Sequence, residues 1–231
     1  MDCKIDKLIL PESVAEIKDH AFALSKIKIF ESNSPNFVIE NNGLYELMTY
    51  MKRQIKRLVR YIGDEWVPHE IETEEWWDTA AFLDVKMPEH FIVPKNVLLN
   101  YWTFVGNIGI KEVEFPPTYL EIDTEKLSPF GSVDKIILQE GITSVGDLPR
   151  YSNEPWIYRL RKPREDSTEK NRQVYYYQEV FRFGGKEIVI PDSVKHIANV
   201  HGDCTIICHQ DSFAYNYAKK HGIKIKLIKN K

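Results

Sequence analysis

One short sequence frame recurs along this chain and limits what the chain can fold into. In each clear copy an apolar triplet runs directly into a proline, and apolar residues follow three and six positions beyond it. The frame is clearest at 7–17 and 186–197, and weaker copies lie at 91–97, 113–122 and 136–145. The proline positions of these three, 94, 116 and 139 (a glutamine in the last), are 22 and 23 residues apart, which indicates a repeat protein.

Each part of the frame has a physical consequence. The triplet predicts a short buried strand, and the proline ends it because proline lacks the N–H that a ladder needs. The two later apolar residues, such as Val194 and Ile197, are expected to point inward against the neighbouring copy. One repeat buries too little apolar surface to be stable alone, so we expect short parallel strands stacked about 4.8 Å apart.

Two other segments complete the pattern. Residues 36–45 look like a short family insertion, a strand that turns at Asn-Gly and leads to a hairpin, and 204–228 look like a closing segment of a strand, a short helix and a last strand. Together with the repeats, these segments resemble the BspA-like leucine-rich repeat family of bacterial and protozoan proteins. The resemblance implies a right-handed leucine-rich repeat solenoid, β-rich with few short helices, that forms a single domain over 1–231.

Residues 63–90 fit the frame poorly and are interpreted as a degenerate, acidic repeat. Residues 64–90 contain nine acidic side chains and the single cation Lys86, together with Trp66, Trp76 and Trp77. Two interpretations stay open for these tryptophans, packing in the core or recognition of a partner. Trp76 and Trp77 are the recognition candidates.

Residues 150–183 predict an insertion, because the flanking frame positions are 52 residues apart with no repeat between them. Two alternating segments around a polar loop indicate a long β-hairpin that projects from the solenoid. The hairpin either covers a sheet edge or forms the binding surface. Its candidate partner-binding residues are the aromatic side chains Trp156, Tyr158, Tyr175 and Tyr177.

Residues 44–62 allow two interpretations, since their apolar residues fall at helical spacing while the resemblance implies a hairpin; we favour the hairpin. This segment also carries five cations without an acid among them, which predicts either a solvated face or an anion site. The cations are Lys52, Arg53, Lys56, Arg57 and Arg60.

The C-terminal cap, 204–231, is predicted to contain a helix with Asp211 or Ser212 as N-cap and Gly222 as its stop. Phe213, Tyr217 and Ala214 are expected to face the last repeat. Cys204 and Cys208 in one strand would lie some 13 Å apart, too far to share an ion, so no metal is predicted. Three cysteines also give no disulfide framework.

Charge and motifs limit the function. The net charge of −3 gives no general attraction to nucleic acid, and no apolar run reaches 18 residues, so neither nucleic-acid binding nor membrane insertion is expected. If Met1 is the native start, the location is cytoplasmic; a fragment of a longer protein would be surface-attached or secreted, as the resemblance implies.

No catalytic motif or cofactor site is recognisable, and no catalytic residue is assigned. We therefore expect a non-catalytic protein that binds another protein. Adhesin-type binding of a glycan or matrix component is the alternative, and an enzyme or metal protein is the third possibility.

Overall fold

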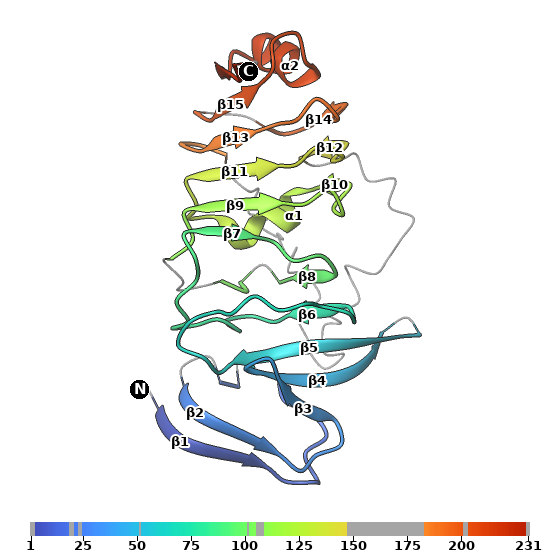
Figure 1. Ribbon diagram of the computed structural model, residues 1–231, viewed down its shortest axis with the longest axis vertical. Helices are drawn as coiled ribbons and strands as arrows, with labels where there is room; N and C mark the ends of the chain where they lie inside the picture. The colour runs from blue at the N-terminus through green and yellow to red at the C-terminus, as the bar shows by residue number, and fades with distance from the viewer. Residues whose placement is uncertain are drawn as a thin grey trace, which may run out of the picture.

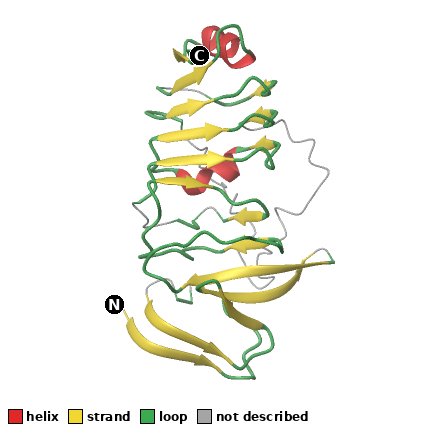
Figure 2. Ribbon diagram, in the orientation of Figure 1, coloured by secondary structure: helices red, strands yellow, loops and turns green. Residues whose placement is uncertain are grey.

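The computed structural model describes residues 3–18, 21–22, 25–50, 52–100, 102–104, 109–146, 183–200 and 203–229. Strands stack along one long axis, with β1 at one end and helix α2 at the other (Figure 1). Strands and loops make up most of this part of the chain, as Figure 2 shows. The elements are β1 (Cys3–Leu10), β2 (Ser25–Ser32), β3 (Phe37–Glu40), β4 (Gly43–Tyr50), β5 (Arg53–Tyr61), β6 (Glu75–Trp77), β7 (His90–Ile92), β8 (Val97–Leu99), β9 (Glu112–Phe115), β10 (Glu121–Ile122), α1 (Thr124–Leu127), the 3₁₀ turn Ser128–Phe130, β11 (Lys135–Leu138), β12 (Ser144–Val145), β13 (Glu187–Val189), β14 (His196–Ile197), β15 (Thr205–Cys208), α2 (Phe213–His221) and β16 (Lys224–Leu227).

The apolar triplets form the main ladder, a six-stranded sheet in the order β16-β15-β13-β11-β9-β7. All neighbours in it are parallel, and the register aligns Val113, Ile136, Ile188 and Ile206 in adjacent strands. These four side chains are completely buried. The sheet confirms the solenoid predicted from the repeated frame.

A second ladder uses the apolar residues six positions beyond each proline. Strands β10, β12 and β14 pair in parallel and place Ile122, Val145 and Ile197 in register. The exposed fractions of these side chains are 0, 1 and 6 %. Each turn of the solenoid therefore contributes one strand to each of two ladders, and the core lies between the two ladders.

The segment 44–62 is a β-hairpin, as favoured from the sequence. Strand β4 pairs antiparallel with both β3 and β5. Asn41 and Asn42, in the turn between β3 and β4, have φ values of 46° and 57°, a left-handed conformation that asparagine tolerates better than most residues. Strand β5 then pairs in parallel with β6, which joins the hairpin to residues 63–90.

The buried apolar residues fall into two clusters. The larger extends from Tyr45 to Ile223 and includes the acidic repeat and the C-terminal turns. The smaller holds Leu10, Ile17, Ile27, Phe30, Phe37, Leu44 and Val59, around the parallel pair of β1 and β2.

Helix α2 closes the C-terminal end of the stack. The Ser212 side chain accepts a hydrogen bond from the Tyr215 N–H, and Gly222 ends the helix with a φ of 65°, as predicted. The expected inward face was wrong for Phe213, which is 42 % exposed. Ala214 is buried and Tyr217 packs against the core, as expected, and Ala218, four residues after Ala214, is buried on the same face.

Candidate functional site

Trp77 belongs to the core. Its side chain is 0 % exposed, and its ring lies 4.8 Å from that of Phe82 and 6.5 Å from that of Trp66, measured between centroids. Its indole N–H donates a hydrogen bond to Glu75 at 2.7 Å. Of the two interpretations open for this residue, the structure therefore selects core packing, and the recognition role expected of Trp77 was wrong.

Trp76 has the opposite orientation. Side chains alternate across a strand, so the buried positions of Glu75 and Trp77 turn Trp76 outward, where it is partly exposed. Its register partner in β8 is Leu98, which is 45 % exposed. A partly exposed tryptophan and an exposed leucine thus lie side by side on the outside of the solenoid.

Leu120 continues this row in the next turn, since it follows Pro116 by four residues, as Leu98 follows Pro94. The Tyr119 hydroxyl donates to the carbonyls of Pro94 and Val97 at 2.8 and 2.9 Å, which stacks the two turns directly. Leu120 is 60 % exposed, the largest value among the exposed large apolar side chains of the described chain.

Polar residues continue the row. The Thr143 N–H donates to the Leu120 carbonyl, and the Lys195 N–H donates to the Thr143 carbonyl, both at 2.8 Å. We call Trp76, Leu98, Leu120, Thr143 and Lys195 the outer column. The outer column therefore has three apolar side chains at one end and two polar ones at the other. Protein interfaces likewise combine an apolar part with polar residues beside it.

The outward face of the six-stranded sheet is the other regular surface. Ile92 is 52 % exposed there, while Ile137 and Val189 are partly buried. Its charged side chains are largely paired with one another, as the Lys135–Glu112, Lys226–Glu187 and His90–Glu114 pairs show, at 3.2, 3.1 and 2.8 Å. Glu114 stands in register between Ile92 and Ile137, so a charged side chain interrupts the apolar row on this face.

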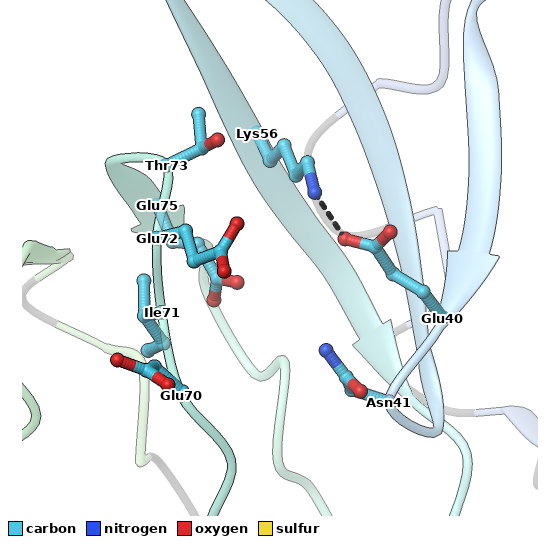
Figure 3. Close-up of a pocket in the computed structure, with 8 residues that line it drawn as sticks. All are labelled: Glu40, Asn41, Lys56, Glu70, Ile71, Glu72, Thr73 and Glu75. Atoms are coloured by element: carbon cyan, nitrogen blue, oxygen red, sulfur yellow. Dashed lines mark hydrogen bonds and ion pairs between the residues drawn. The ribbon is translucent and has the colours of Figure 1, made fainter.

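An acidic pocket of about 210 Å³ lies between the β3–β4 turn, β5 and the segment before β6. Glu40, Glu70, Glu72 and Glu75 line it, together with the single cation Lys56, which is ion-paired with Glu40. Figure 3 shows Glu72 and Glu75 on one side of the space and Glu40 and Asn41 on the other. Four carboxylates against one ammonium make the pocket electronegative.

Glu75 differs from the other acids of this pocket because it is only 3 % exposed. One of its oxygens accepts the Trp77 indole N–H, and the other lies 3.7 Å from Nε2 of His69. The Tyr45 hydroxyl is buried nearby, and its interaction with the Glu75 carboxylate is one of the causes that raise its pKa. Burial raises the pKa of Tyr45, and the charges of Glu75 and Glu40 raise it further, so the hydroxyl keeps its proton.

The His69–Glu75 pair predicts a pH-dependent contribution to stability. The neighbouring Glu75 carboxylate raises the pKa of His69 above its usual value of 6.5, so the folded chain binds this proton more tightly than the unfolded chain. The stabilisation is complete below that usual value and is lost as the pH rises through the folded pKa. We therefore expect His69→Gln to lower the free energy of unfolding more at acidic than at alkaline pH, measured by urea unfolding across that range; a pH-independent difference would contradict the pairing.

The five cations for which the sequence predicts either a solvated face or an anion site do not share one surface. Arg57 and Arg60 are 6 and 5 % exposed. Arg57 forms ion pairs with Glu46 and Asp78, and Arg60 donates to the carbonyls of Ala80 and Leu83 at 3.0 and 2.8 Å. Both guanidinium groups hold neighbouring turns together, whereas Lys52 and Arg53 are exposed.

The remaining residues singled out in the sequence are the four aromatic side chains of the predicted hairpin and two cysteines of the C-terminal cap. Trp156, Tyr158, Tyr175 and Tyr177, with the hairpin predicted at 150–183, lie outside the described residues. Cys204 and Cys208 are buried free thiols, and burial raises the pKa of each. In the described ranges no three His, Cys, Asp or Glu side chains are placed to hold a metal ion, and no helix is long and apolar enough to cross a membrane.

Leu98 and Leu120 were missed by sequence reasoning, although a signal was present. Both stand four residues beyond a frame proline and directly after the first inward position, where side-chain alternation favours an outward orientation. An isolated exposed leucine is common on protein surfaces. Only the stacking of two such positions beside Trp76 makes them a candidate site.

Comparison with known proteins gives one match. The family profile of the BspA type leucine rich repeat region matches residues 1–67, with six copies. No curated protein and no solved structure matches the chain. The profile agrees with the resemblance found in the repeated frame, and beyond the matched residues the structure has a parallel six-stranded sheet that extends from β7 to β16.

Proposed function

We propose that this chain, which carries BspA-type leucine-rich repeats, recognises a protein partner without catalysing a reaction, and that the outer column is its contact surface. The row of Trp76, Leu98 and Leu120 is the observation that supports this proposal. These side chains come from three successive turns, so the rigid stacking of the solenoid fixes their spacing. A rigid apolar surface loses little conformational entropy on binding.

The composition of the outer column favours a protein over a glycan. A sugar ring that stacks on an aromatic side chain also needs polar groups beside that ring for its hydroxyls. Trp76 instead has an exposed leucine as its register neighbour. Aromatic and aliphatic side chains that desolvate together are typical anchors of protein–protein interfaces.

The double substitution Leu98→Lys with Leu120→Lys is expected to abolish partner binding. Two charges introduced at the centre of an apolar contact cost desolvation energy, and loss of such anchors weakens binding by roughly tenfold or more. Both side chains are largely exposed, so the fold should be unaffected. The measurement is capture of a partner on the immobilised chain, identification by mass spectrometry, and the dissociation constants of the purified pair.

The matched control is Ile29→Lys, because Ile29 is an equally exposed aliphatic residue on β2, outside the outer column. This variant should bind like the unaltered chain. Equal affinity of the double variant would overturn the proposal for this surface. A chain without residues 155–181 tests the proposed contribution of Trp156, Tyr158, Tyr175 and Tyr177, and a glycan array tests the adhesin alternative.

A further inference from the structure

The end of the β4–β5 hairpin is a projecting part of the molecule that lies outside the outer column. Strand β3 pairs with β4 only over residues 43–46, and β6 pairs with β5 only over residues 56–58. Between these limits the two hairpin strands pair with each other and with no other described strand. Figure 1 shows this end of the hairpin beyond the neighbouring described turns. We call residues 47–50 and 52–54 the hairpin tip.

The hairpin tip carries apolar side chains on both of its faces. Leu47 is 44 % exposed on one face, and Met48 and Tyr50 are partly exposed on the other, since side chains alternate along a strand. A two-stranded hairpin has no second layer that would cover such side chains. A protein that docks sideways would cover one face, whereas a membrane surface surrounds a projecting tip and covers both faces at once.

The turn of the hairpin is locally basic. Lys52 and Arg53 are exposed, and neither forms an ion pair with a described residue. No acidic residue occurs in the sequence between Glu46 and Asp64. The whole chain has a net charge of −3, so this positive charge is a local property of the hairpin. Basic side chains grouped in this way are attracted to anionic lipid surfaces.

The acidic repeat does not cancel the positive charge of the hairpin tip. It meets the hairpin at Lys56, whose N–H donates to the Glu74 carbonyl at 3.1 Å. Arg53 lies three residues nearer the turn, which is about 10 Å along an extended strand. Solvent-exposed charges this far apart are largely screened at physiological salt, where the Debye length is about 8 Å. The positive field of the tip therefore remains effective at an anionic surface.

We propose that the hairpin tip binds the surface of a membrane that contains acidic lipids. Lys52 and Arg53 contact the lipid phosphates through charge-assisted hydrogen bonds. Leu47, Met48 and Tyr50 enter the boundary between the headgroups and the acyl chains, where tyrosine is enriched in membrane proteins. Such contact at the surface needs no membrane-spanning helix, and the proposal does not depend on the function of the outer column.

Co-sedimentation of the intact chain with lipid vesicles tests this proposal. The vesicles contain phosphatidylcholine alone or an equimolar mixture with the acidic lipid phosphatidylglycerol. We expect saturable binding to the mixed vesicles and roughly twentyfold weaker binding to the neutral ones, because each basic side chain near an acidic surface strengthens binding by about fivefold. Soluble poly-glutamate presents negative charge without a lipid boundary, so it should not displace the chain from the mixed vesicles.

Lys52→Glu with Arg53→Glu should weaken binding to the mixed vesicles by about twentyfold or more. The matched control is Lys224→Glu with Lys229→Glu, which changes the net charge by the same amount at exposed positions in the C-terminal cap, away from the hairpin. Leu47→Gln with Tyr50→Gln keeps every charge and should weaken binding by about tenfold, because it removes the apolar contact with the lipid boundary. Circular dichroism checks the fold of each variant.

The outcomes that contradict the proposal are equally specific. It is overturned by absence of saturable binding to the mixed vesicles, by equal weakening in the control pair, or by unchanged binding of the Leu47→Gln, Tyr50→Gln variant. Displacement by poly-glutamate would also overturn it, and would make the hairpin tip a site for an acidic protein instead.

Discussion

Ile190→Asp should unfold the chain as one cooperative unit. Ile190 is 0 % exposed and its N–H donates to the Ile207 carbonyl at 2.9 Å, so it lies at the centre of the main ladder. Truncation of a buried aliphatic side chain costs about 2–5 kcal/mol, and burial of a carboxylate adds a further large penalty. The sum is comparable with the whole stability of a typical domain, about 5–15 kcal/mol.

Urea unfolding followed by circular dichroism and tryptophan fluorescence measures this effect. Ile190 and Trp77 belong to one continuous core cluster although many turns separate them, so both signals should be lost together. Val189→Asp is the matched control, because the neighbouring side chain faces outward and is partly exposed. A variant that retains the tryptophan signal while losing the rest would show two independently folding units.

The second large loss of stability is expected on substitution of Arg57, which lies where the β4–β5 hairpin meets the acidic repeat. Its guanidinium contacts Glu46 at 2.6 Å and Asp78 at 3.4 Å, and it donates to the Ile17 carbonyl. Arg57→Met leaves the buried Asp78 carboxylate and the partly buried Glu46 carboxylate without this counter-charge. Loss of one partner from such a buried pair costs about 3–5 kcal/mol, which we expect as the drop in the free energy of unfolding.

The pH dependence of this loss of stability distinguishes the effect of the Arg57 charge from the effect of its packing. Burial already raises the pKa of Glu46, more than Arg57 lowers it. Without the guanidinium, the Glu46 carboxylate should take up a proton in mildly acidic solution, so the stability of Arg57→Met should approach that of the unaltered chain as the pH falls. Arg53→Met, an exposed position on the same strand, should change stability by less than about 0.5 kcal/mol. A loss that is independent of pH would assign Arg57 a packing role alone.

The repeated frame determined most of the fold. The strands that precede Pro116 and Pro191, and the inward positions of Ile122 and Ile197, follow from local rules about proline and side-chain alternation. The apolar spacing of 44–62 suited a helix as well as a hairpin, and the antiparallel pairing of β4 with β5 decided between them.

Tertiary structure alone decided the candidate sites. Alternation requires one of Trp76 and Trp77 to face inward, but only the packing of Trp77 against Phe82 decides which one. Arg57 and Arg60 look like surface cations until Asp78 and the carbonyl of Ala80 are placed beside them. The acidic pocket brings together Glu40 and Glu75, which are distant in sequence, because β5 pairs with β6. Local propensity fixes what each residue does within its own turn, whereas a site depends on which turns become neighbours.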